Sequence, residues 1–140
     1  MKFKFLKHTA DVKFQAFGKD IAEAFKNSAE AFREVITKDK IKPLIEKTIK
    51  VKGKDKNSLL YNFLEEFIFL LDTKNLIMAR IECIEIEKNK SGMKLEATIY
   101  FDDIKKYKTI NDVKAVTYND MFVEFDEKNK KCVCQVVVDV

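Results

Sequence analysis

The segment from residue 57 to residue 74 constrains the fold more than any other part of this chain. Asn57 or Ser58 can cap a first helical turn, and helical spacing continues to about Lys74. The apolar positions form one wide stripe: Leu60, Phe63, Leu64, Phe67, Ile68 and Leu71. This stripe is broader than a coiled-coil seam, so the sequence predicts a helix that is the central packing element of a core.

A second amphipathic helix is predicted over residues 21–36. Asp20 precedes it as a candidate cap, and Glu23 completes a pair that resembles a capping box. Its apolar side chains also recur at helical spacing: Ile21, Phe25, Ala29, Phe32 and Ile36. This helix too must lie on another apolar surface.

The other patterned segments favour strands. Residues 93–101 alternate with a strict period of two after a turn, which predicts a hairpin, and the alternation of residues 77–87 slips near Cys83, which indicates a bulge. The predicted strands are 3–6, 12–17, 45–52, 77–87, 93–101, 113–125 and 131–140. The order β-β-α-β-α-β-β-β-β predicts an α+β fold with two helices packed on a largely antiparallel sheet.

Length and glycine content limit the possible functions. A chain of 140 residues without a Pro/Gly-rich linker predicts one domain over residues 1–140. Three dispersed glycines cannot build a phosphate-binding loop, and no serine-centred nucleophile motif occurs. These features argue against common hydrolases, kinases and dinucleotide-binding enzymes.

The three cysteines indicate a reducing compartment. Cys83, Cys132 and Cys134 cannot all pair within the chain, and no segment has the pattern of a signal peptide or a membrane span. We therefore expect a cytoplasmic protein without a membrane partner. Cys132 and Cys134 share one strand face, where packed thiols are favoured over zinc because the sequence offers no obvious further ligands.

The positive charge is carried almost entirely by lysine. The net charge is +4, and Arg33 and Arg80 are the only arginines among 27 basic residues. Lysines are densest over residues 38–56, which favours a solvated face. Weak attraction to RNA or to an acidic partner is the alternative.

Candidate ligands lie near both ends of the sequence. Asp139 and the carboxylate of Val140 follow an apolar strand, and Asp11 follows a polar turn. If Asp11 lies beside them, these oxygens could hold a hard cation such as Mg²⁺, Mn²⁺ or Ca²⁺. The alternatives are a turn aspartate and a solvated strand end. His8 could be a hydrogen-bonded turn residue, a metal ligand or a base.

Lys114 is a further candidate, because it stands at the start of an apolar strand, where an edge-strand lysine is the simpler interpretation.

Four segments together resemble the archease family. They are HTADV at residues 8–12, LLYNFLEE at residues 59–66, VKAVTY at residues 113–118 and the ending VDV at residues 138–140. They occur in the family's order and extend over essentially the whole chain. HTADV and VKAVTY are specific in combination, whereas either one alone would be weak.

The resemblance implies an accessory protein and not an enzyme. Archeases activate the RtcB-type RNA ligase, which joins RNA ends bearing a 3′-phosphate or cyclic phosphate to a 5′-hydroxyl in tRNA splicing and repair. They promote guanylylation of the ligase by GTP and allow many turnovers. The resemblance therefore implies that this protein contacts RNA only indirectly, through the ligase. Asp11, Asp139 and Lys114 match the family's motif residues, and Asp112 and Glu66 match places where acids are common.

Two departures and two rival functions remain open at this level. Lys13 stands where many archeases have glycine, and Asn119 stands where many have histidine. A metal-dependent phosphoesterase could use the same acids. An RNA-binding or chaperone-like helper of RNA modification could use the lysine-rich segment.

Overall fold

The computed structural model describes residues 1–7 and 11–140, and in this part of the chain the predicted fold class and element order are confirmed. A short 3-10 helix over Ile104–Lys106 follows the fifth strand. The elements are β1 Phe3–Leu6, β2 Val12–Gly18, α1 Ile21–Ile36, β3 Ile45–Gly53, α2 Lys56–Lys74, β4 Leu76–Asn89, β5 Gly92–Asp103, β6 Ala115–Asp126 and β7 Lys131–Asp139.

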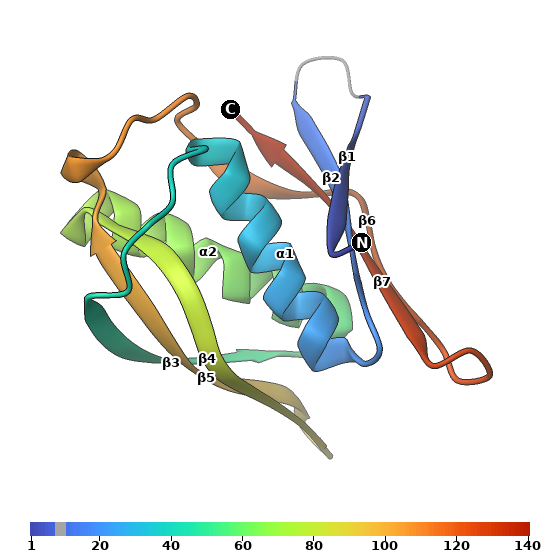
Figure 1. Cartoon of the computed structure of the whole chain (residues 1–140). Coiled ribbons are helices and arrows are strands. Elements are labelled where there is room, and N and C mark those ends of the chain that lie inside the picture. The colour runs from blue at the N-terminus through green and yellow to red at the C-terminus, as the bar shows by residue number, and fades with distance from the viewer. Residues whose placement is uncertain (8–10) are drawn as a thin grey trace.

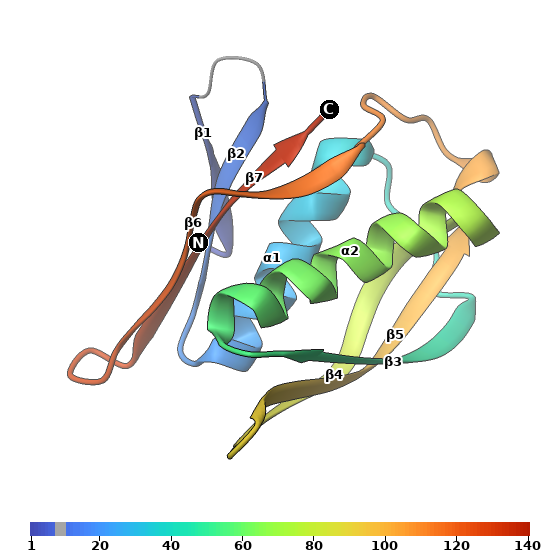
Figure 2. The same cartoon turned by 180° about the vertical axis from the view of Figure 1, so that it is seen from behind.

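The strands divide between two antiparallel sheets instead of forming one. The four-stranded sheet has the order β1-β2-β7-β6, and the three-stranded sheet has the order β3-β5-β4. Both helices lie between the two sheets (Figures 1 and 2). The wide apolar stripe of α2 explains this arrangement, because a single sheet would leave part of the stripe in water.

The cap of α2 lies two or three positions earlier than the sequence predicted. Asp55, and not Asn57 or Ser58, is the cap: its carboxylate accepts from the backbone N–H of Ser58 at 2.9 Å. The backbone N–H of Asp55 in turn donates to the Ser58 hydroxyl at 3.1 Å. These reciprocal bonds form a capping box, so Ser58 takes part from the third helical position. The predicted cap of α1 is confirmed, since Asp20 accepts from the Glu23 N–H at 2.8 Å.

Aromatic rings fill the space between the sheets. Phe63 of α2 is fully buried and stacks on Phe25 of α1 with ring centroids 6.2 Å apart. Phe67, one turn along α2, contacts Phe63 edge-on at 5.0 Å and reaches Phe101 of β5 at 6.2 Å. These contacts join both helices to the three-stranded sheet in one core.

The pairing of two strands, β4 and β6, with their neighbours is irregular. β4 has register shifts between Met78 and Arg80 and between Ile81 and Cys83, so the bulge predicted near Cys83 is confirmed. The pairing of β6 with β7 is interrupted between Thr117 and Phe122. The prediction of one strand over residues 113–125 did not include this interruption, although it lies at Asn119 and Asp120, residue types that are depleted in strands.

Neither helix in the described residues combines the length and hydropathy that crossing a membrane requires. Cys132 and Cys134 are fully buried on β7, which confirms the packed-thiol interpretation. The hydrogen bond with Cys132 and burial together raise the pKa of the Cys134 thiol well above its ordinary value.

Candidate functional site

One end of the four-stranded sheet brings the main candidate residues into adjacent positions. The β2–β7 register pairs Val12 with Val138, so Asp11 and Asp139 are each one residue beyond that pair. In Figure 1 the C-terminal end of β7 lies near the start of β2. The cation hypothesis requires Asp11 to lie beside the end of the last strand. The backbone pairing of β2 with β7 places it there.

The start of β6 completes this end of the sheet. Ala115 is the register partner of Asp139, and the backbone N–H of Lys114 donates to the Asp139 carbonyl oxygen at 2.8 Å. Val140 is half-buried and packs against the core. We call Asp11, Asp139, Val140 and Lys114 the acidic tip.

The donor chemistry of the acidic tip suits a hard cation. Carboxylate oxygens on adjacent strands are ligands that Mg²⁺, Mn²⁺ and Ca²⁺ accept, and Mg²⁺ commonly uses one or two carboxylates together with water and phosphate oxygens. Across residues 1–7 and 11–140 no three or more His, Cys, Asp or Glu side chains gather in a metal-binding group. A cation at the tip would therefore need donors besides the described acidic side chains.

The other predicted site residues are His8, Asp112 and Glu66. His8 lies outside the described residues, so its proposed roles are not placed. Asp112 is exposed on the segment before β6 and lines a small pocket of about 210 Å³ together with Asp72 of α2. Glu66 is half-buried on α2. The structure thus places Asp112 two residues before Lys114 and Glu66 on a separate element.

Glu65 is a residue that sequence reasoning missed. Its carboxylate accepts from the backbone N–H of Val116, two residues after Lys114, at 3.3 Å. Tyr61 lies one helical turn earlier on the same side of α2 and stacks on Tyr118 of β6 at 4.2 Å. The spacing of Tyr61 and Glu65 is the signal that could have indicated a helix face directed at β6.

The departure at Lys13 has a local explanation. The Lys13 ammonium group pairs with the Asp120 carboxylate at 3.2 Å, and Asp120 has a left-handed backbone with φ of 55°. The Gln135 amide donates to the Asp120 carbonyl at 2.7 Å and Gln15 donates to Gln135 at 2.9 Å. Lys13 therefore belongs to a polar network on the outer face of β2, β7 and β6.

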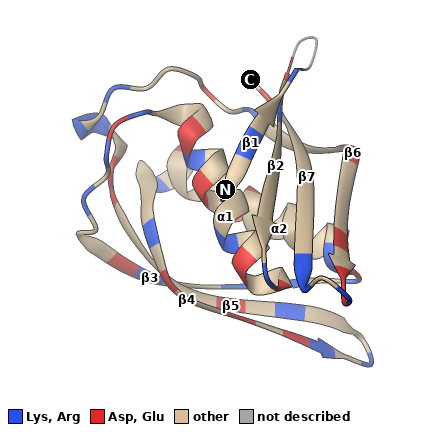
Figure 3. Cartoon of the chain, turned by 45° about the vertical axis from the view of Figure 1, so that its right-hand side comes forward, with Lys and Arg blue, Asp and Glu red and all other residues tan. Residues whose placement is uncertain are grey.

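The lysine-dense segment does not form one compact basic face. Figure 3 shows basic residues on both sheets, on the helices and along connecting loops. Lys50 and Lys52 are exposed on β3, which is an edge strand of its sheet. Charged side chains on an edge strand discourage pairing with other chains, which supports a solvated surface as their role.

The protein is a small α+β protein in which two antiparallel sheets enclose two helices. Asp11, just before β2, and Asp139, at the end of β7, form a candidate oxygen-ligand tip at one end of a sheet. The profile of the Archease protein family (MTH1598/TM1083) matches residues 3–140. The chain therefore belongs to the archease family.

Individual relatives agree with this membership. Protein archease of Pyrococcus abyssi is 36% identical over 126 residues, which cover 88% of each chain. Protein archease of Methanosarcina mazei is 31% identical over 144 residues, covering 99% of this chain and 96% of the relative.

Two solved structures are similar in fold. The solution structure of a Methanobacterium thermoautotrophicum protein has a TM-score of 0.85 at 30% identity, covering 99% of both chains. A Thermotoga maritima crystal structure, titled an archease and possible chaperone, has a TM-score of 0.62 at 20% identity, covering 98% of this chain and 96% of that one. At that identity the second likeness concerns the fold alone.

Proposed function

We propose that this protein is an accessory activator of an RtcB-type RNA ligase, acting in tRNA splicing and RNA repair. The observation that carries the proposal is the convergence of Asp11, Asp139 and Lys114 at one end of the four-stranded sheet. Membership of the archease family supports this choice of partner. In this proposal the protein promotes GTP-dependent guanylylation of the ligase and sustains many turnovers.

The acidic tip is the part that contacts the ligase. Asp11, Asp139 and the Val140 carboxylate would hold a divalent cation, Mg²⁺, Mn²⁺ or Ca²⁺. Bound there, the cation supplies positive charge that can orient and neutralise phosphate oxygens. Lys114 is joined to Asp139 by its backbone hydrogen bond, and its ammonium group can approach a phosphate.

The proposed role is positioning, not catalysis by this chain. The ligase supplies the nucleophile and the active-site metal, so this protein has only to place charge correctly while the complex forms. Orientation and fixed electrostatics can contribute several kcal/mol to a reaction without any covalent step on the accessory protein. Asp112, Glu66 and His8 are additional contacts to the ligase in this proposal.

The test is a ligation assay with limiting RtcB-type ligase from the same source, Mn²⁺, GTP and RNA carrying a 3′-phosphate. Addition of the protein should raise product from about one to many molecules per ligase. The ligase–guanylate should form faster in a parallel assay without RNA. A competent ligase that gains neither turnover nor guanylylation would contradict the proposal.

Two further arms separate the rival functions. Release of phosphate or a nucleoside from phosphoesters by the isolated protein, abolished by Asp139→Asn, would favour a metal-dependent phosphoesterase. Stimulation of an RNA-modifying enzyme with no effect on the ligase would favour a helper of RNA modification.

A further inference from the structure

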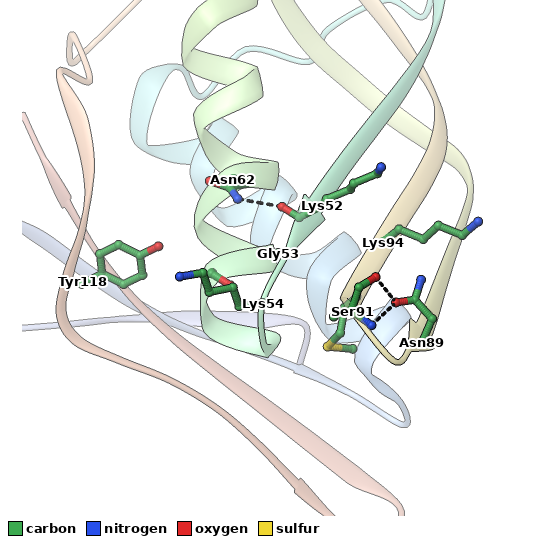
Figure 4. Close-up of a pocket in the computed structure, with 11 residues that line it drawn as sticks. Lys52, Gly53, Lys54, Asn62, Asn89, Ser91, Lys94 and Tyr118 are labelled. Atoms are coloured by element: carbon green, nitrogen blue, oxygen red, sulfur yellow. Dashed lines mark hydrogen bonds between the residues drawn. The ribbon is translucent and has the colours of Figure 1, made fainter.

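A second pocket lies away from the acidic tip, at the end of the molecule where α2 begins. It has a volume of about 680 Å³ and is bounded by the end of β3, the first turns of α2, the β4–β5 hairpin and Tyr118 of β6 (Figure 4). None of the four acidic-tip residues lines it. Its volume falls in the range of small-molecule sites.

The charge of this pocket is one-sided. Lys52, Lys54 and Lys94 line it, and in the described part of the chain none of its lining side chains is a carboxylate. Lys52 and Lys94 also line a neighbouring pocket together with Glu85, Glu87 and Glu96. Glu87 pairs with Lys94 at 3.2 Å on the exposed surface, and the Asp55 carboxylate is engaged by the Ser58 N–H. The pocket is therefore suited to an anion.

The geometry of the lysines differs between the two sides of the pocket. Lys52 and Lys94 are register partners on β3 and β5, so their side chains leave neighbouring strands together. Figure 4 shows both extending to the same side, while Lys54 extends toward Tyr118. Lys54 is thus the lysine directed at the aromatic ring, whereas Lys52 and Lys94 extend away from that ring.

Tyr118 supplies a flat aromatic surface at one edge. Its ring lies nearly parallel to Tyr61 of α2, with an interplanar angle of 5° and centroids 4.2 Å apart, yet Tyr118 is 54% exposed. Burial, then Tyr61 and the Asp55 carboxylate, raise the pKa of the Tyr118 hydroxyl, so the ring stays uncharged at neutral pH. A ring fixed by one stack is a suitable platform for a planar partner on its open surface.

The pocket floor is backbone and polar groups. A Cβ on Gly53 would lie 2.5 Å from the Leu59 nitrogen, which shows how closely β3 approaches α2 at this point. Asn62 donates to the Lys52 carbonyl at 2.7 Å, while Asn89 accepts from the Ser91 hydroxyl at 2.8 Å. These bonds hold the amide side chains in place around the lysines.

We infer that this pocket binds a phosphorylated nucleoside, with the base stacked on Tyr118 and the phosphate at Lys54. The combination of an exposed, supported aromatic ring with the Lys54 ammonium group directed at it and no described carboxylate in the lining carries the inference. Bases of any sequence can stack, and lysines recognise phosphate as point charges, so recognition is of the nucleotide unit and not of its sequence. The unit comes either as a free nucleotide or as part of a single-stranded RNA.

The experiment measures binding by the isolated full chain, without ligase, in low salt. A 5′-fluorescein-labelled RNA hexanucleotide is followed by anisotropy, and adenosine 5′-monophosphate is followed by calorimetry. Wild type should bind the hexanucleotide with a dissociation constant of roughly 1–100 µM. Tyr118→Ala should weaken binding about tenfold, whereas Tyr118→Phe should retain it, because stacking needs the ring and not the hydroxyl.

Charge variants separate this pocket from general attraction to lysine. Lys54→Ala should weaken binding and reduce the slope of log affinity against log salt by about 0.7. The matched control is Lys128→Ala, which removes an exposed lysine on the β6–β7 turn that does not line the pocket. Circular dichroism should show that all four variants remain folded.

The two probes distinguish the source of the nucleotide. Binding of the monophosphate with the same variant pattern supports the inference for a free nucleotide, and binding of the hexanucleotide alone supports it for an RNA strand. Absence of binding by both probes up to about 1 mM, or equal affinities in wild type, Tyr118→Ala and Lys54→Ala, would overturn it. Ligase stimulation is measured separately, so failure here leaves the proposed function intact.

Discussion

The backbone N–H of Lys114 donates to the carbonyl oxygen of Asp139 at 2.8 Å, and this bond joins the residue before β6 to the last residue of β7. Because both atoms belong to the backbone, substitution of either side chain leaves the bond available. The chemistry of the acidic tip can therefore be changed while its strand geometry is retained.

Replacement of Asp139 with asparagine should remove ligase stimulation while preserving the fold. The amide keeps the shape of the side chain but loses the negative charge that a divalent cation requires, and we expect a loss of about tenfold or more in metal affinity and in stimulated turnover. Calorimetric Mn²⁺ titration and the ligation assay check this. Glu127→Gln is the charge-matched control, because Glu127 is exposed in the β6–β7 turn.

Glu65 should prove to position the start of β6. Glu65→Ala leaves the N–H of the buried residue Val116 without its 3.3 Å acceptor, and we expect a loss of roughly 1–2 kcal/mol in the free energy of unfolding. Glu65→Gln should recover most of that loss because an amide oxygen also accepts. Urea unfolding measures both variants, and Glu66→Ala serves as the neighbouring control. Equal stability of Glu65→Ala and wild type would contradict this role.

The Lys13–Asp120 ion pair should contribute little to stability. The Asp120 side chain is 58% exposed, so water and salt screen the attraction, and Lys13→Ala should cost less than about 1 kcal/mol. Thermal unfolding at low and high salt is the measurement. The difference between Lys13→Ala and wild type should shrink as salt rises. A large difference that persists in salt would show that packing of the lysine stem matters more than charge.

Asp102 should produce a pH dependence of stability in acid. The Tyr107 hydroxyl at 2.5 Å, opposed by burial and assisted by Lys106 and the Asp103 N–H, lowers the pKa of Asp102 from 3.8 to about 2. Since the folded-state pKa lies below the unfolded value, this stabilisation is present above about pH 4 and is lost between about pH 4 and pH 2.

Unfolding midpoints across pH 2–6 test this expectation, with Asp102→Asn as the variant. The variant should be less stable than wild type near neutral pH, and its midpoint should fall less steeply in acid. Parallel curves for the two proteins would assign the acid sensitivity to other carboxylates.

The thiols should differ sharply in reactivity. Cys83 is exposed, whereas Cys132 and Cys134 are buried on β7 and the pKa of Cys134 is raised. Titration of the native protein with a thiol-reactive disulfide reagent should modify Cys83 rapidly and the other two only after unfolding. Cys83→Ser should abolish the fast phase. Rapid reaction of all three would indicate that β7 opens easily.

The local pattern of the sequence was sufficient to predict the helices and strands. The helical spacing of Phe25 and Phe32, the Asp20 cap and the alternation around Ile99 each depend on neighbours only a few residues away, and each prediction is confirmed. The predicted cap of α2 was wrong, because Asp55 and Ser58 cap the helix reciprocally. The cap preference of a single residue does not show which of several nearby polar residues lies just before the first turn.

The amino-acid sequence by itself determined the α+β class, the element order and, through four segments, the archease family. Tertiary structure decided the rest: the division into two sheets, the interruption before Phe122, the Glu65 contact and the Tyr61–Tyr118 stack. The Glu65 contact and the tyrosine stack join residues more than 50 positions apart, and the pairing of β2 with β7 joins residues more than 100 positions apart. Which strands pair at such separations depends on how both helices bury their apolar faces together. The periodicity of one segment cannot predict it, because that periodicity depends only on neighbouring residues.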